Sequence, residues 1–298
     1  QLIKNTNPNN NIYYLCIKNH DTDSVSPFKI FEKLNLNNYF LEIKKIDNLD
    51  SFFESIKILK KYKISKFYYL NEDRPVLNKL RDILYFKFLF NCRVYGLNIL
   101  KKNDKYFEGF YLANKVKKIS LKELNNLNEL LSAKIKKNIK FSNNLKINNY
   151  ISISPGGRIP QKRWDITYWR ILIKKIISKN KNIKIILLGT KKDKYQNNKI
   201  SNQFKKNILD LTGKTSFKSL ISIINSTDLH ICHDDGTMHL AILLKKKVLT
   251  LFHNIDFKNK WFQGNDAKHI QLYDSNGVNE IKVQNVFLNY LKLKTKKF

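Results

Sequence analysis

Short apolar runs alternate with helix-like segments through the carboxyl-terminal half of the chain. The β-branched and apolar runs predict strands at Ile151–Ser154, Ile183–Leu188 and Leu229–Cys232. Between these runs, apolar residues recur at helical spacing from Ile166 to Ser178, and Phe217 to Asn225 is also helix-like. Strands that alternate with helices of this length favour a parallel α/β sheet.

The amino-terminal half has its own alternating pattern. It predicts four strands, at Asn11–Ile17, Tyr39–Ile43, Lys66–Leu70 and Cys92–Gly96. It also predicts three helices, at Ser51–Lys61, Val76–Phe88 and Leu121–Ile135. The polar segment Lys136–Asn149 is typical of a linker. With 298 residues the chain is long enough for two domains, which we place at 1–145 and 146–280, and a helical tail follows at 281–298.

The turn after Leu229–Cys232 carries the first candidate chemistry. Its sequence is His233-Asp234-Asp235-Gly236-Thr237-Met238-His239, and a helix-like run follows. A strand that turns through Gly into a helix presents free backbone N–H groups and the positive end of the helix dipole, which suits a phosphate. A purely structural alternative is that Asp234 caps this helix.

A second turn of this kind follows Ile151–Ser154. Pro155, Gly156 and Gly157 allow a sharp bend and a close approach of a ligand to the backbone. Three cations then follow, Arg158, Lys162 and Arg163, and Asp165 is placed to cap the next helix. Two more turns lie at Gly189-Thr190 and at Leu211–Ser216. All four turns end presumed parallel strands, at the edge where open α/β sheets bind ligands.

These motifs, in this order, resemble the carboxyl-terminal half of glycosyltransferase family 9, the lipopolysaccharide heptosyltransferases. The resemblance rests on S-P-G-G-x(4)-K-R-W, L-L-G-T, L-T-G-K-T-S and D-D-G-T-M-H-L-A, and it spans about Asn149 to Asp274. It implies an α/β fold of the GT-B type, in which two Rossmann-like domains with parallel sheets flank a cleft. It also implies an inverting transfer, most simply of heptose from ADP-heptose to a lipopolysaccharide core or related surface glycan. Another nucleotide-sugar donor is the alternative.

The resemblance assigns a set of donor-binding residues to the second domain. Lys162 matches the family's phosphate-contacting lysine, Asp234 its donor-site aspartate and His239 the motif histidine, while Gly236, Thr237 and Met238 are expected to offer backbone N–H groups. The remaining positions expected around the donor are Gly156, Gly157, Arg163, Gly189, Thr190, Lys214, Thr215 and Asp235. Structural roles compete with several of these, such as a solvated Lys162 or a core His239.

Two departures from the family pattern stand out. Asp235 replaces the usual Ser or Thr and brings a negative charge toward the expected pyrophosphate, so we expect its side chain to point away. The chain also contains no Gly-Asp pair, which in the family belongs to a first strand and turn that carry the proposed catalytic base. We therefore expect an amino-terminally truncated or divergent member, lacking roughly 20–30 residues and unable to transfer sugar. Asp21, Asp23 and Asp73 do not sit in the right context, so the catalytic base is unassigned.

Composition narrows the remaining function classes. The net charge is +32, from 56 Lys and Arg against 24 acidic residues, and the lysines are spread along the whole chain. A nucleic-acid-binding protein is thus an alternative function, but the sequence contains no zinc finger, RNA-recognition motif or basic zipper. A basic surface also suits an anionic glycolipid acceptor and peripheral contact with the inner face of the inner membrane. A nicotinamide-dependent oxidoreductase is disfavoured, since G-x-G-x-x-G is absent.

Cysteine and histidine usage bears on location and cofactors. Cys16, Cys92 and Cys232 are isolated thiols, which indicates the reducing cytoplasm. His233 and His253 have no ligand cluster at metal-binding spacing, so we expect neither a metal nor another cofactor.

Overall fold

A computed structural model describes residues 13–17, 39–43, 49–68, 76–95, 133, 147, 149–256, 258 and 267–296. Contacts divide the chain into two compact units, Gln1–Leu131 and Ser132–Phe298. The domain boundary expected from the sequence lay later, between residues 145 and 146. The predicted helix at Leu121–Ile135 and the linker that follows lie almost entirely outside the described residues, as do Asp21, Asp23 and Asp73.

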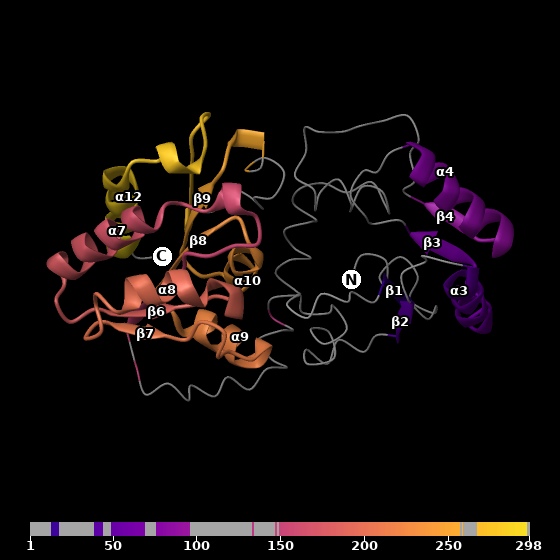
Figure 1. Ribbon diagram of the computed structural model, residues 1–298, viewed down its shortest axis with the longest axis horizontal. Coiled ribbons are helices and arrows are strands. Elements are labelled where there is room, and N and C mark those ends of the chain that lie inside the picture. The colour runs from indigo at the N-terminus through magenta and orange to yellow at the C-terminus, as the bar shows by residue number, and fades with distance from the viewer. Residues whose placement is uncertain are drawn as a thin grey trace. The chain divides into compact units, whose positions relative to one another are not determined.

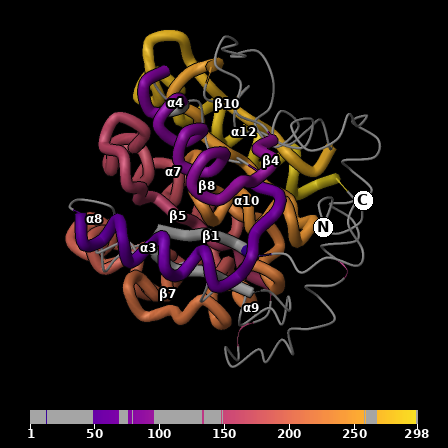
Figure 2. The backbone as a smooth tube through the Cα atoms, turned by 90° about the vertical axis from the view of Figure 1, so that its right-hand side faces the viewer, coloured from indigo at the N-terminus to yellow at the C-terminus, as the bar shows by residue number. Residues whose placement is uncertain are grey.

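The second unit is built on a six-stranded, wholly parallel sheet with the order β10-β9-β8-β5-β6-β7. The labelled strands β10, β8, β5 and β7 follow one another in this order in Figure 2. The strands are β5 (Tyr150–Ser154), β6 (Lys184–Leu187), β7 (Ile208–Asp210), β8 (Leu229–His233), β9 (Val248–Phe252) and β10 (His269–Tyr273). Helices cover both faces of a parallel sheet, which explains why its central strands are almost continuously apolar.

The two faces of this sheet differ in chemistry. Alternate residues of a strand point to opposite faces. Ile151, Ile153 and Ile231 therefore share one face, and they pack in an aliphatic cluster with helix residues such as Trp169 and Ile173. The opposite face carries buried polar residues, among them Ser152, Ser154, His230 and Thr250.

In the described part of this unit, five α-helices connect or follow these strands. They are α7 (Ile166–Lys179), α8 (Lys194–Ser201), α9 (Phe217–Ser226), α10 (Gly236–Leu243) and α12 (Val283–Thr295), with short 3-10 turns at Pro160–Lys162, Lys191–Asp193 and Val278–Glu280. Asp165 caps α7 as predicted, because its carboxylate accepts the N–H of Thr167 at 2.6 Å. Among the described residues, no helix combines the length and apolar character needed to cross a membrane.

The described part of the first unit contains two parallel strand pairs. One pair joins β1 (Tyr13–Ile17) to β2 (Tyr39–Ile43), and the other joins β3 (Lys66–Tyr68) to β4 (Arg93–Tyr95). The helices are α3 (Leu49–Lys61) and α4 (Val76–Leu84), the latter followed by a π-helical turn at Tyr85–Leu89. Leu59 and Phe86 form a small core, with Phe67 stacked on Phe86. All four predicted strands are present, within one or two residues.

The carboxyl-terminal helix α12 packs on α7, beside which it lies in Figure 1. The expectation from the GT-B resemblance that this helix also packs back on the first domain stays a prediction. Val286, Tyr290 and Leu293 of α12 belong to the aliphatic cluster of the second unit. An apolar stripe specifies which face of a helix is buried, but it does not specify the partner.

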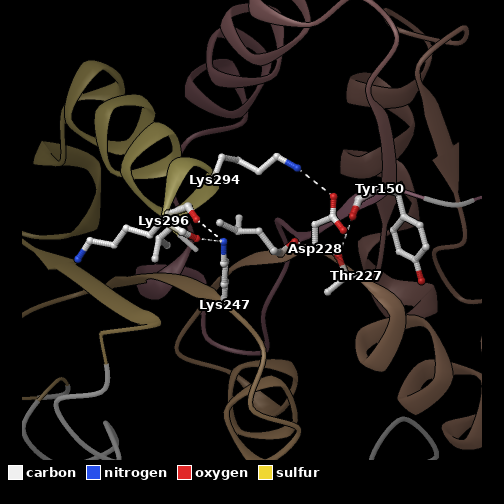
Figure 3. A network of polar contacts seen from close by, with 8 residues as sticks. Tyr150, Thr227, Asp228, Lys247, Lys294 and Lys296 are labelled. Carbon is white, nitrogen blue, oxygen red and sulfur yellow. Dashed lines mark hydrogen bonds and ion pairs between the residues drawn. The ribbon is translucent and has the colours of Figure 1, made fainter. Parts of the chain in front are cut away.

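A polar network joins the carboxyl-terminal end of α12 to the residues that directly precede β8 and β9 (Figure 3). The ammonium of Lys247 donates to the carbonyl oxygens of Leu293 and Lys296, both at 2.7 Å. Beside it, Lys294 pairs with Asp228 at 2.9 Å. The last carbonyls of a helix have no partner within the helix, so Lys247 supplies a cationic cap where the helix dipole is negative.

Replacement of this cap should destabilise the second unit. Lys247→Met keeps the aliphatic stem and removes both hydrogen bonds, so we expect a loss of about 1–2 kcal/mol. In a unit of this size that corresponds to a melting temperature lower by roughly 2–8 °C. Calorimetric melting measures it, with Lys292→Met as the control because Lys292 lies exposed in the same helical turn. Equal melting of the two variants would contradict the capping role.

Candidate functional site

Four turns converge on one edge of the sheet in the second unit. All six strands run parallel, so every strand ends at the same edge. The strand order places the turns after β8, β5, β6 and β7 in a row. The prediction that these turns share the carboxyl edge of a parallel sheet is confirmed, and open α/β sheets bind ligands at this edge.

The turn after β5 is a loop that carries the expected cations. Pro155 and Gly156 are buried, whereas Arg158 is exposed. A Cβ added to Gly156 would overlap the carboxyl group of Asp193, while a Cβ at Gly157 would meet open space. Gly156 is therefore required by close packing, and Gly157 leaves room for a ligand beside the backbone.

Lys162 and Asp234 bring two of these turns together. The Lys162 ammonium lies 2.5 Å from the carboxylate of Asp234, with side-chain exposures of 12% and 4%. The cation comes from the loop after β5 and the anion from the turn after β8. Two motif residues far apart in sequence thus form one charged, largely buried centre.

The start of α10 differs from the expectation. Asp235, not Asp234, is the N-cap, and its carboxylate accepts the N–H groups of Thr237 at 2.7 Å and Met238 at 3.0 Å. The alternative of Asp234 as the cap is wrong. The amides of Thr237 and Met238, expected to face a phosphate, are already occupied by the chain's own carboxylate. The Asp235 side chain turns toward the first amides of α10, and Gly236 is exposed. The expectation that it points away from a bound pyrophosphate stays a prediction.

A buried hydrogen-bonded chain lies beneath this cap. His230 has Ser152 Oγ at 2.8 Å from Nδ1 and Thr237 Oγ1 at 2.8 Å from Nε2. Thr237 Oγ1 in turn donates to Asp235 at 2.6 Å. Burial lowers the pKa of His230 to about 3, so the ring is neutral at ordinary pH. This series of hydrogen bonds links the cap of α10 to the polar face of the sheet.

His239 lies on the first turn of α10, near the ion pair. It is half-buried, and burial lowers its pKa, with Asp234 opposing the shift and Lys162 adding to it. Both charges of the Lys162–Asp234 pair therefore act on the imidazole of His239.

His233 was not assigned a role in the donor site from sequence, yet it holds the loop after β5. Its Nε2 accepts the backbone N–H of Trp164 at 2.9 Å, and its Nδ1 lies 3.0 Å from the carbonyl oxygen of Gly156. Arg163, expected near the phosphate, also braces this loop, since its Nε donates to Gly157 O at 2.7 Å.

The turns after β6 and β7 complete the row. Thr190 and Asp193 form a capping box, in which the carboxylate accepts the Thr190 N–H at 2.8 Å and hydroxyl at 2.7 Å. Gly189 accepts the N–H of Gly213 at 2.9 Å. Lys214 bonds the carbonyl of Asp210 at 3.2 Å, and Thr215 follows it, half-buried. Lys214 and Thr215 lie beside the outermost strand of this row, apart from the Lys162–Asp234 centre.

Comparison with known proteins identifies the family. Residues 104–290, more than half of the chain, match glycosyltransferase family 9 (heptosyltransferase). The chain belongs to this family. It is 28% identical over 238 residues to lipooligosaccharide heptosyltransferase 2 of Campylobacter jejuni, covering 74% of this chain and 72% of that protein.

Solved structures of family 9 glycosyltransferases share the fold. The ADP-heptose lipopolysaccharide heptosyltransferase II of E. coli is 15% identical, with a TM-score of 0.62 over 98% of this chain and 92% of that one. A family 9 glycosyltransferase of Veillonella parvula is 16% identical, with a TM-score of 0.67 over 99% and 92%. The predicted α/β fold of the GT-B type is confirmed.

Within this family 9 protein, the acidic cap has an electrostatic consequence. Burial raises the pKa of Asp235 to about 6, and the hydrogen bonds from Thr237 and Met238 oppose this rise only in part. A carboxyl whose pKa is raised on folding stabilises the fold fully below its unfolded pKa of about 3.8, and this contribution is lost as the pH rises through about 6.

Asp235→Asn should reveal this titration. Asn caps a helix about as well as Asp and does not ionise. Relative to the Asn variant, the wild-type protein should lose on the order of 1 kcal/mol of stability between about pH 4.5 and pH 7.5, a value discounted for partial solvent screening. Urea denaturation at the two pH values measures the difference. A constant gap between the two proteins would show that the Asp235 pKa is ordinary.

The described residues contain no cluster of potential metal ligands. No group of three His, Cys, Asp or Glu side chains there is placed to hold a metal ion. His233 uses both ring nitrogens on backbone groups, so it is committed to the loop.

Proposed function

We propose that this family 9 protein transfers heptose from ADP-heptose to a lipopolysaccharide core or related surface glycan, with inversion at the anomeric carbon. Support comes from the family match and from two relatives. The relative in Campylobacter jejuni is a lipooligosaccharide heptosyltransferase, and the E. coli structure is an ADP-heptose heptosyltransferase.

The Lys162–Asp234 centre is the observation that carries this proposal. A glycosyl transfer of this kind places negative charge on a departing diphosphate, and a cation fixed in advance at that point stabilises the charge. Lys162 is largely buried, and the carboxylate of Asp234 holds its ammonium in a short bond. A diphosphate would take Asp234's place on the ammonium and leave that carboxylate to accept hydrogen bonds from sugar hydroxyls.

The backbone around this centre suits the rest of the donor. The amides of Thr237 and Met238 are engaged by Asp235, so we place the diphosphate nearer Gly236, which is exposed and has open space above its Cα. Gly157 offers the same opening on the facing loop. Gly189, Thr190, Lys214 and Thr215 continue the row of turns and are proposed to line the nucleoside.

The reaction itself follows from the donor chemistry. A base removes the proton from an acceptor hydroxyl, and that oxygen attacks the anomeric carbon while the bond to the diphosphate breaks. The diphosphate leaves with the bonding electrons, and Lys162 balances its charge. We propose no metal for this step and leave the base unassigned.

The excess of positive charge fits an anionic acceptor. With a net charge of +32, the protein attracts phosphorylated core glycolipids and the anionic surface in which they lie. We therefore propose a cytoplasmic protein that contacts the inner face of the inner membrane peripherally.

A transfer assay tests the proposal. The protein is incubated with deacylated inner-core acceptor and either ADP-heptose or UDP-N-acetylglucosamine, with and without EDTA. In protein that carries the family's Gly-Asp turn, mass spectrometry should detect heptose addition from ADP-heptose alone, unaffected by EDTA, and NMR should report the inverted anomer; residues 1–298 alone are expected to give no transfer. Transfer only from the uridine sugar would replace the donor assignment, and loss of transfer in EDTA would replace the metal-independent mechanism.

A further inference from the structure

One imidazole ring holds both ends of the loop that carries Lys162. His233 ends β8, and its ring reaches across to the loop after β5, with its side chain almost wholly buried. Nδ1 lies 3.0 Å from the carbonyl oxygen of Gly156, at the start of the loop. Nε2 lies 2.9 Å from the backbone nitrogen of Trp164, at its end. Lys162 lies between these two anchor points.

The bonding partners determine the protonation of the ring. A backbone N–H can only donate, so Nε2 must be the bare, accepting nitrogen toward Trp164. The proton then sits on Nδ1 and is donated to the carbonyl of Gly156. Burial lowers the pKa of His233 to about 4, which keeps this single neutral tautomer at ordinary pH.

The residue that follows β8 holds the cation itself. Asp234 binds the Lys162 ammonium, so consecutive residues secure the frame of the loop and its functional side chain. The Arg163 bond to Gly157 O adds a second cross-link inside the first. A loop fixed at both ends and at its centre loses little further freedom when a ligand binds, which favours affinity.

We propose that His233 is a positioning residue for the donor: by closing the loop between Gly156 and Trp164 it places Lys162 against the diphosphate. The inference rests on the proposed role of Lys162 in binding the donor. It assigns to His233 no contact with substrate.

Three substitutions separate the two hydrogen bonds from the ring's packing. His233→Phe keeps an aromatic ring against Trp169, which the imidazole meets edge-on at 5.4 Å, but removes both bonds. His233→Asn can restore a donor near the Nδ1 position, and His233→Gln an acceptor near the Nε2 position. Calorimetry with ADP should show about tenfold weaker binding for Phe and intermediate values for Asn and Gln.

A double-mutant cycle then asks whether the effect passes through the lysine. In a Lys162→Ala background, His233→Phe should weaken ADP binding by less than about twofold, because the positioned group is gone. Lys247→Met serves as the stability control, since it loosens the opposite end of the sheet and should leave ADP affinity unchanged.

The outcomes discriminate cleanly. Wild-type affinity in the folded Phe variant would overturn the inference, and so would an equal loss in both backgrounds, which indicates a general structural effect. If the Phe protein does not fold, the Asn and Gln variants provide the test. ADP affinities below that of the wild type support the inference, and wild-type affinity in both variants overturns it. Failure of the wild-type protein to bind ADP would instead contradict the proposed function.

Discussion

Gly156→Ala should lower the free energy of unfolding by about 1–3 kcal/mol and weaken donor binding together with it. The added methyl group would overlap the carboxyl group of Asp193. That carboxyl cannot move aside easily, because it is 5% exposed and bonded to the N–H and hydroxyl of Thr190. The loop must shift instead, and it carries Lys162.

Gly157→Ala is the matched control for stability. An added methyl group at Gly157 meets nothing within contact distance, so urea denaturation should give a value near wild type. Neither glycine is among the residues with a left-handed backbone, so the comparison isolates the steric overlap. Equal stability of the two variants would contradict the close packing of Gly156 on Asp193.

Lys162→Ala should weaken ADP binding at least tenfold. A charge-assisted bond to a phosphate contributes about 1.5–3 kcal/mol, and Lys162 is bound to Asp234, a carboxylate of the turn that leads into α10. Calorimetry on the wild-type and variant proteins measures the loss. Arg158→Ala, an exposed cation of the same loop, should change the affinity much less.

The lysine variant also leaves a buried carboxylate without its partner, which destabilises the fold by itself. Lys162→Ala combined with Asp234→Asn removes that charge. This double variant should recover stability in urea denaturation while its ADP affinity remains low. Recovery of affinity together with stability would mean that Lys162 acts only through folding.

The pattern of apolar positions predicts much of this fold, because burial of both sheet faces leaves a strong local signal. The strands around Ile151, Ile185 and Ile231 are apolar on the face that packs against α7. Once these strands are parallel, their turns must share an edge. The candidate site could therefore be located before its geometry was known.

Other features depend on contacts that no local pattern encodes. Asp234 and Asp235 have equal preference for a cap, so residue type alone does not show that Asp235 is the one whose carboxylate accepts the amides of α10. His233 reaches Gly156 and Trp164, which lie 77 and 69 residues away along the chain. In the first unit the predicted helix at Val76–Phe88 becomes π-helical from Tyr85, a local widening that apolar spacing does not reveal.

The frame around His233 also gives the protein an optical reporter. Trp164 and Trp169 are both buried and lie edge-to-face, with ring centroids 5.2 Å apart. Trp164 follows Lys162 by two positions, and its backbone N–H donates to the imidazole of His233. Any ligand that shifts the loop therefore changes the surroundings of an indole pair, so intrinsic fluorescence can follow occupancy of this edge of the sheet without a label.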